Sequence, residues 1–245
     1  MRIIAGVVKQ VCKFLLVSSI LLAKGSFAQT QDSYDYNSEF TWGINKNSSG
    51  GFIGGFTFKS SRRISKTLFE TFGVELMNVK NPHEVRVQSV NSGNYFIYGK
   101  THYLYAIRLQ YGRDMVLFTK GPQQGVEVKA VTAIGPSIGI VAPYYVEITD
   151  STFYSSRVPY TSQQYSRIVG TGSLFQGLGD SKIQMGANFK IALNFEFGNG
   201  KNNVQGFEAG FLLDAYFKKV PLMAHTENYS VYPTVFLTLF FGSRR

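Results

Sequence analysis

Residues 182–197 read KIQMGANFKIALNFEF, and their side chains alternate between apolar and polar with a period of two. The odd-numbered positions from Ile183 to Phe197 are all apolar, while the even-numbered positions from Lys182 to Glu196 are mostly polar. Only Ala192 interrupts the polar set. Because successive side chains of a β-strand point to opposite faces of a sheet, this pattern predicts one long strand with an apolar face and a charged face.

The length of this predicted strand distinguishes two β architectures. A soluble β-sandwich packs its apolar faces together and uses strands of about five or six residues. A strand of the present length, at about 3.3 Å per residue, can cross a bilayer even when tilted. A membrane barrel turns its apolar face to lipid and its polar face to the lumen. We therefore predict an all-β fold, a transmembrane antiparallel up-and-down β-barrel. A soluble periplasmic β-protein is the alternative.

The composition agrees with a membrane barrel. Of the 245 residues, 16% are charged and 15% are aromatic, with 25 Gly, 21 Phe and 15 Tyr against one Trp. Low charge with many aromatic residues suits an apolar belt with aromatic rings at the interfaces. Outside the N-terminal segment, no run has the roughly 18 apolar residues that a spanning helix needs.

The formal net charge is +10. An excess of Lys and Arg over Asp and Glu is typical of proteins that bind nucleic acid or an anionic surface. For an exported barrel the natural anion is the phosphate of lipid headgroups, so we expect outer-membrane lipid as a partner and no nucleic acid. Solvated Lys and Arg side chains scattered over the loops would give the same balance.

The N-terminus has the features of a secretory signal peptide over residues 1–28. Positive charges precede the apolar run 14–23, FLLVSSILLA, and Ser26-Phe27-Ala28 forms a small-x-small cleavage site. An uncleaved anchor helix is the rival interpretation, but the run is short for one. Residues 29–37 are a polar lead-in, and residues 38–243 form the predicted outer-membrane barrel domain. The one cysteine, Cys12, lies in the signal segment.

Seven further segments alternate in the same way, which gives eight predicted strands. They cover residues 39–46, 51–59, 67–79, 100–111, 125–148, 204–218 and 231–242. Asn47–Gly50 and Gly198–Lys201 are turn signals. Pro136 lacks a ladder donor and predicts a bulge or bend. Ten strands are possible if residues 84–90 or 111–119 pair separately.

The lengths of the connections also fit an outer-membrane barrel. With the N-terminus in the periplasm, the outer connections are 47–50, 80–99, 149–181 and 219–230, and three of these four are long. Of the inner connections, 60–66 and 199–203 are short, while 112–124 is longer than expected. Short periplasmic turns and long outer loops are typical of these proteins. We expect an envelope protein partner to bind at loops 80–99 and 149–181.

Charged residues of both signs are predicted inside the barrel. An eight-stranded barrel has room for side chains but not for a water channel. Because the positive and negative charges nearly balance, we expect interior ion pairs and a plugged core. A polar pore or a binding site in the lumen is the alternative. The inward charged residues are Glu75, Arg108, Glu127, Lys129, Lys190, Glu196, Glu208 and Asp214.

No catalytic, cofactor-binding or metal site is predicted. His102 is expected near a strand end facing inward, and His83 and His225 lie in outer loops. Barrel enzymes that act on lipid combine a His with a Ser and an acid near the outer rim. His225, Glu227 and Ser230 are close in sequence, and residues 151–156 supply serines in a neighbouring loop. Such residues are common in loops, and no nucleophile motif is present.

Six tyrosines lie near the ends of predicted strands. They fit the interfacial girdles of a membrane barrel, and a sugar-binding surface is the alternative. These residues are Tyr95, Tyr98, Tyr144, Tyr145, Tyr229 and Tyr232.

Residues 38–243 resemble the small outer-membrane β-barrel proteins, in particular the PorT-like barrels of Bacteroidota. The segments Phe72–Arg86, FGVELMNVKNPHEVR, and Tyr98–Arg113 carry the resemblance. The end of the chain, Phe240-Phe241-Gly242 followed by Ser243-Arg244-Arg245, departs from the terminal aromatic residue of proteobacterial barrels. The resemblance implies a barrel in the outer membrane of a Gram-negative cell and no site residues.

These observations lead to a non-enzymatic outer-membrane barrel with a structural, adhesive or envelope-assembly role carried by its long outer loops. A lipid- or glycan-modifying barrel enzyme is the first alternative, and a narrow pore is the second.

Overall fold

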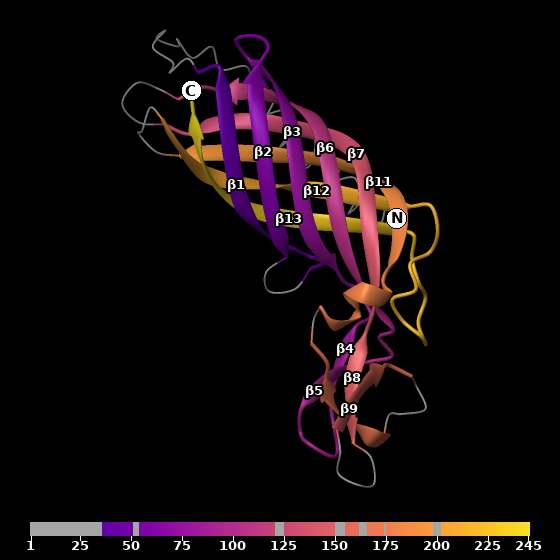
Figure 1. The fold of residues 1–245 in the computed structure, drawn as a ribbon. Coiled ribbons are helices and arrows are strands. Elements are labelled where there is room, and N and C mark those ends of the chain that lie inside the picture. The colour runs from indigo at the N-terminus through magenta and orange to yellow at the C-terminus, as the bar shows by residue number, and fades with distance from the viewer. Residues whose placement is uncertain are drawn as a thin grey trace, which may run out of the picture. The chain divides into compact units, whose positions relative to one another are not determined.

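Eight antiparallel strands close a barrel in the computed structural model, which describes residues 36–50, 54–120, 125–149, 155–161, 166–173, 175–197 and 202–245 (Figure 1). The strands follow one another around the barrel in chain order, and the first strand pairs with the last. The barrel strands are β1 (Ser38–Asn47), β2 (Gly55–Arg63), β3 (Leu68–Val79), β6 (His102–Phe118), β7 (Glu127–Pro143), β11 (Lys182–Phe197), β12 (Asn203–Tyr216) and β13 (Val231–Arg244). The predicted up-and-down barrel is confirmed, with eight strands rather than ten in the described part of the chain.

The stretch 182–197 forms β11 with the bounds that its alternation predicts. It pairs with β7 on one side and with β12 on the other. Ile191 is 49% exposed on the outer face, whereas its neighbour Lys190 is 4% exposed inside the barrel. Ala192, which blurred the pattern, also points inward, where it packs in a small apolar cluster with Leu212 and Phe236.

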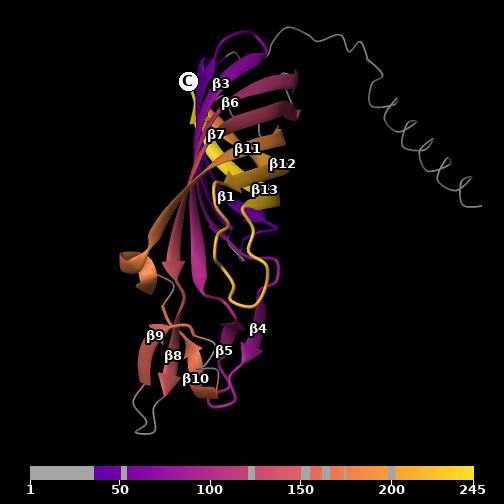
Figure 2. The same cartoon turned by 90° about the vertical axis from the view of Figure 1, so that its right-hand side faces the viewer.

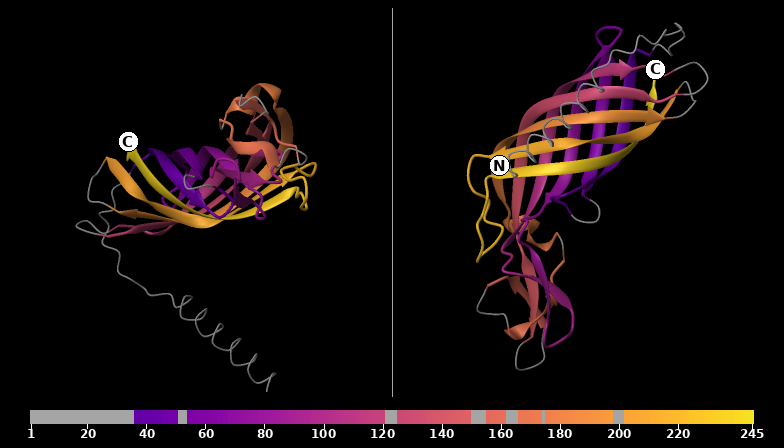
Figure 3. Two further views of the ribbon diagram at one scale, coloured as in Figure 1. Left: turned by 90° about the horizontal axis from the view of Figure 1, so that it is seen from below. Right: turned by 180° about the vertical axis from the view of Figure 1, so that it is seen from behind.

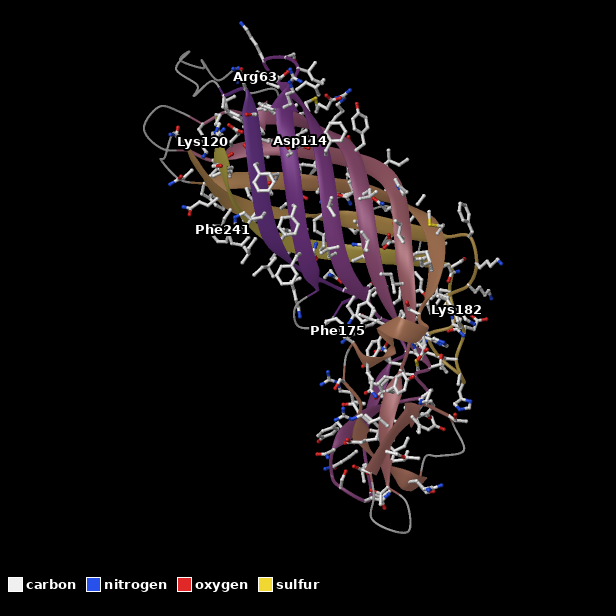
Figure 4. All side chains as sticks on the ribbon, viewed as in Figure 1. Arg63, Asp114, Lys120, Phe175, Lys182 and Phe241 are labelled. Atoms are coloured by element: carbon white, nitrogen blue, oxygen red, sulfur yellow. The ribbon has the colours of Figure 1, made fainter. Side chains whose placement is uncertain are left out.

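The outer face of the barrel is apolar on every strand. Large apolar side chains with the outward parity are exposed, as Figure 4 shows for Phe241. One such residue from each strand in turn is Trp42, Phe58, Val74, Leu109, Ile134, Phe189, Leu213 and Leu237. We call this surface the belt. Water solvates such a continuous apolar surface poorly, whereas the hydrocarbon of a bilayer is a favourable environment for it.

The connections differ strongly between the two ends of the barrel. At the turn end lie the links β2–β3, β6–β7 and β11–β12 and both ends of the barrel chain, where Asn37 N–H donates to Arg245 O at 2.8 Å (Figure 3). At the loop end lie the links β1–β2, β3–β6, β7–β11 and β12–β13 (Figure 2). This alternation confirms the predicted grouping of the connections.

Two of the loop-end connections contain strands of their own. The β3–β6 connection holds the hairpin of β4 (Val85–Gln88) and β5 (Tyr95–Tyr98). The β7–β11 connection holds β8 (Tyr145–Thr149), β9 (Ser155–Pro159) and β10 (Ile168–Thr171), which pair in the order β10-β8-β9, and a short 3-10 helix, η2 (Gln176–Asp180). We call β4, β5, β8, β9 and β10 together the extension (Figure 1).

Four predicted segments have different bounds. The second strand, predicted at 51–59, is β2 at Gly55–Arg63, so the strand continues into the predicted turn 60–66. β6 continues to Phe118, so the fourth predicted strand was too short and the predicted link 112–124 too long. The predicted strand 125–148 is divided at Tyr144 into β7 and β8. Residues 84–90 contribute β4, which pairs outside the barrel. The turn signal at 198–201 lies outside the described residues.

Pro136 interrupts the ladder between β6 and β7, as its missing N–H predicts. Paired positions run to Arg108 and Ser137 and resume at Tyr111 and Ile134. The amide of Asn188 on β11 lies at this gap, and its Nδ2 donates to the carbonyl oxygens of Gly135 and Pro136, both at 3.0 Å. An inward polar side chain therefore satisfies carbonyls that the ladder leaves open.

The predicted signal peptide, residues 1–28, lies outside the described residues, and the domain boundaries stay predictions. Tyr36, at the end of the predicted lead-in, is buried in the barrel and stacks on Phe69 with ring centroids 4.9 Å apart. No helix in the described part of the chain combines the length and the apolar character that crossing a membrane requires.

Candidate functional site

The barrel interior at the turn end is a cluster of buried ion pairs. Lys129 Nζ lies 3.1 Å from a carboxylate oxygen of Glu127, 3.2 Å from Glu39 and 3.7 Å from Glu196. Arg244 Nη2 lies 3.1 Å from Glu39 and also contacts Glu196. Each of these carboxylates has a cation within hydrogen-bond distance, which offsets part of the cost of burying the charges.

A second layer of ion pairs fills the middle of the barrel. Arg108 Nε donates to both oxygens of Asp214, at 3.0 and 3.1 Å, and its Nη1 lies 3.2 Å from Glu75. Lys190 Nζ bridges Glu75 at 2.7 Å and Glu208 at 2.6 Å. These charged side chains come from β3, β6, β11 and β12, so the layer ties opposite walls of the barrel together.

All eight charged residues that the alternation placed inside the barrel are buried there. Five partners were missed by the sequence analysis: Glu39, Lys59, Asp114, Lys120 and Arg244. Asp114 fell in a predicted link and Arg244 lay beyond the predicted last strand. The signal that could have found them is the even spacing from inward residues of the same strand, continued past the predicted ends.

The loop end of the interior is closed by apolar side chains. Residues 217–230, which connect β12 to β13, fold into the opening, and Val220 and Leu222 pack there against Leu104 and Tyr232. Leu222 O accepts from Thr101 N–H at 2.8 Å. Between the ion-pair layers, the interior leaves a cavity of about 20 Å³. Such a cavity holds about one water molecule. In the described residues, paired charges therefore fill the barrel interior, and apolar side chains cover its loop end.

The extension has an aromatic core. Phe96, Tyr144, Tyr160 and Ile168 are buried together, so the hairpin of one connection packs against the sheet of the other. The Tyr144 hydroxyl accepts from the backbone N–H of Ile97 at 3.1 Å. Burial raises the pKa of Tyr144 to about 12, although that hydrogen bond opposes the shift.

Hydrogen bonds also join the two connections of the extension. Ser89 Oγ donates to Ile168 O at 2.5 Å, and Asn91 Nδ2 donates to Ser166 O at 2.6 Å. The described parts of the predicted loops 80–99 and 149–181 thus belong to one folded unit.

A buried lysine lies where the extension meets the barrel. Lys100 is fully buried, with Nζ 2.7 Å from Glu84 Oε1 and 4.3 Å from the centre of the Tyr103 ring. Burial lowers the pKa of Lys100, while the Glu84 carboxylate opposes that shift. Glu84 Oε2 is also buried and has no hydrogen-bond partner among the described residues.

The histidines lie apart, each with its own partners. His102 Nδ1 lies 2.9 Å from Pro221 O, His83 stacks on Tyr229, and His225 stacks on Tyr98. No hydrogen bond among the described residues joins His225 to the side chains of Glu227 or Ser230, and most of the serine segment 151–156 lies outside the described part. Among the residues that the structure describes, no hydrogen-bonded Ser–His–acid arrangement surrounds these histidines.

Metal binding has no support in the described residues, where no group of three or more His, Cys, Asp or Glu side chains could hold an ion. The predicted tyrosine girdle is wrong for Tyr144 and Tyr232, which are buried in the extension and in the barrel opening. Tyr95 and Tyr98 lie on β5 of the extension, away from the barrel wall.

Comparisons with known proteins find likeness only among solved structures. No family model matches the chain, and no curated protein matches its sequence. The attachment invasion locus protein Ail of Yersinia pestis aligns at 10% identity over 86% of this chain and 99% of its own, with a TM-score of 0.40. Neisserial surface protein A, NspA, aligns at 13% identity over 85% and 95%, with a TM-score of 0.36. None of these comparisons supports the resemblance to PorT-like barrels, which stays a prediction.

Proposed function

We propose that this protein is a non-enzymatic outer-membrane β-barrel that displays the extension as a binding surface for an envelope protein partner. The observation that carries the proposal is the combination of an apolar belt on every barrel strand with an interior filled by ion pairs. A water-soluble protein places these two kinds of side chain the other way round.

The extension supports the binding role. Its surface carries exposed apolar side chains, including Val90 at 84% and Tyr95 at 61% exposure, on strands and turns that lie beyond the barrel wall. Exposed apolar groups outside a membrane are typical of surfaces that contact another protein. The folded sheets hold these side chains in fixed positions, which lowers the entropy cost of binding.

Fractionation and a gel test the membrane part of the proposal. We expect the protein in the outer-membrane fraction, extracted only by detergent, with an unboiled band that migrates faster than the boiled one. A soluble protein without a band shift would show that the apolar faces pack on each other.

Site-specific photo-crosslinking in intact cells tests the partner. A crosslinker in place of Tyr95 should give a protein adduct that disappears in a Val90→Asp variant, while one in place of Ile134 in the belt should give none. A Val90→Asp variant that keeps the Tyr95 adduct would contradict binding at this surface.

The two alternatives give different results in separate assays. A lipid- or glycan-modifying enzyme would change the envelope lipids when His83, His102 or His225 is replaced by Ala, and we expect no change. A pore would conduct in a planar bilayer, and the plugged interior predicts a silent one.

A further inference from the structure

An apolar groove of about 450 Å³ lies on the outer wall of the barrel at the loop end. Its floor consists of belt residues from neighbouring strands, among them Leu76 on β3, Ile107 on β6 and Ile140 on β7. Phe175 and Leu178, at the start of and within η2, form its other side. The groove therefore opens from the same apolar surface that the proposed function assigns to lipid.

Three contacts hold η2 in place, one from the extension and two from the barrel. The Tyr145 hydroxyl of β8 donates to Asp180 Oδ2 at 2.9 Å, and the ring of Phe175, which Figure 4 labels, lies 5.9 Å from the Tyr105 ring of β6. A Cβ on Gly177 would lie 2.4 Å from Pro143 O, so only glycine permits this close approach. Phe175 is nevertheless 67% exposed. A held segment with an exposed aromatic ring beside the belt indicates contact with hydrocarbon.

A polar hollow of about 370 Å³ is lined by residues that follow β3 in the chain, whereas the groove is lined by the last residues of β3 itself. Leu76, Asn78 and Lys80 all point outward, because they are two positions apart along β3 and its end. Leu76 and Asn78 line the groove, and Lys80 lines the hollow. Arg86 and Glu84 line the hollow as well. A molecule with an apolar tail and a polar head could thus occupy both along one strand face.

Polar groups of the hollow and of the groove leave bonding capacity unused. In the hollow, neither Lys80 nor Arg86 forms an ion pair with any residue that the structure describes. Two buried oxygens, Glu84 Oε2 in the hollow and Asn78 Oδ1 in the groove, have no hydrogen-bond partner in the same described set. Buried acceptors normally have donors, and their absence here requires an explanation. Phosphate suits the two cations, and hydroxyl groups suit the two oxygens.

We propose that the groove and the hollow bind one phosphorylated glycolipid of the outer leaflet. An acyl chain lies in the groove beneath Phe175 and Leu178, the phosphate contacts Lys80 and Arg86, and sugar hydroxyls donate to Asn78 Oδ1 and Glu84 Oε2. A sugar headgroup fits better than a plain phosphodiester because only the sugar supplies the hydroxyl donors. The inference rests on the proposed membrane location.

Native mass spectrometry of the protein extracted from its own membranes in mild detergent tests the site. We expect one retained adduct with the mass of a phosphorylated glycolipid. Leu76→Trp, which fills the groove, and Lys80→Gln with Arg86→Gln should each lower the bound fraction about tenfold. The matched controls Leu193→Trp and Lys219→Gln should retain the adduct. A glycerophospholipid adduct, no adduct, or equal loss in the controls would overturn the inference.

A second measurement distinguishes the absence of the glycolipid site from the absence of the proposed membrane location. Trp42, the one tryptophan, lies in the belt and should be quenched by lipids that carry bromine on their acyl chains. A quenched Trp42 with no adduct removes only the glycolipid site. An unquenched Trp42 in reconstituted vesicles removes the membrane location as well. Each variant is included only if its unboiled band still migrates as a closed barrel.

Discussion

The barrel and the extension bury opposite kinds of side chain. Inside the barrel, Arg108 lies between Asp214 and Glu75, whereas inside the extension Tyr144 lies among aromatic and aliphatic side chains. On β6 the change happens within one strand. Tyr103 shares the outward parity of the belt residue Leu109, yet Tyr103 is buried in the core of the extension. The apolar face of β6 continues along the whole strand. Protein of the extension covers it at Tyr103, and in the proposed membrane location lipid covers it at Leu109.

This difference shows how the surroundings decide which face becomes the interior. Where a bilayer covers the apolar face, the polar face must fill the lumen with paired charges. Where protein covers the apolar face, the ordinary hydrophobic core returns. The two regions should therefore respond differently to mutation, and three predictions test this in order of expected effect.

Arg108→Met should give the largest effect. It leaves two buried carboxylates, Asp214 and Glu75, without this cation, and breaking a buried pair costs about 3–5 kcal/mol. Urea unfolding of the barrel refolded in lipid vesicles, followed by the shift between the folded and unfolded gel bands, measures the loss. The control is Arg113→Met on the same strand, because Arg113 pairs with Glu70 in a partly exposed site. That change should cost far less, because water screens an exposed ion pair. Equal losses would contradict a structural role of the ion-pair layer.

Tyr144→Ala should unfold the extension and leave the barrel closed. Removing a large buried side chain costs roughly 3–5 kcal/mol, and here the cost falls on a small unit. Limited proteolysis should cut within residues 145–181 in the variant but not in the wild type, with the same fast-migrating unboiled band for both. Tyr95→Ala, at an exposed position, is the control. Loss of the band shift in Tyr144→Ala would show that the two regions fold as one.

The pH dependence of the extension should report the buried Tyr144 hydroxyl. The folded pKa of Tyr144 is raised to about 12, so its contribution to stability is complete below its unfolded pKa of about 10 and is lost as pH rises toward 12. The stability difference between the wild type and Tyr144→Phe should then shrink by about 1.4 kcal/mol per pH unit in this window. Protease resistance at pH 9 to 12 measures it, and a constant difference would contradict the assignment.

Most of the barrel could be predicted from the sequence because alternation is a local property. β11 was found with its observed bounds, and the inward parity correctly gave Lys190 and Glu208. β6 was cut at Tyr111 because Gly112-Arg113-Asp114 places a charge on the outward face, although the exposed Met115 and Leu117 resume the apolar pattern there. Backbone pairing of β6 with β3 and with β7 continues through residues 112–114 and maintains the strand there.

The extension and the candidate lipid site could not be predicted in this way. Residues 84–90 alternate and were named as a segment that could pair separately, and β4 lies within them, but the alternation did not give the partner strand β5. β10 has four residues, too few to show a period. The contact of Phe96 with Ile168 joins residues of two different connections, and no local pattern encodes it. The apolar groove depends on the position of η2, because Phe175 and Leu178 form one of its sides and Gly177 packs closely against Pro143 O. The pairing of Arg108 with Asp214 spans 106 positions, so the sequence gives the charges but not the partners.

The seam between β1 and β13 has a consequence for how the chain assembles. Glu39 is paired with Arg244, 205 positions away, and the same two side chains form an ion pair. A contact of such sequence separation carries a large loop-closure entropy, and folding slows as the mean separation of contacts increases. The barrel cannot close before the final strand is available, so seven strands with an exposed belt must wait for the eighth. The 14 residues of β13 therefore complete the barrel, and their removal would leave two strand edges open to other chains.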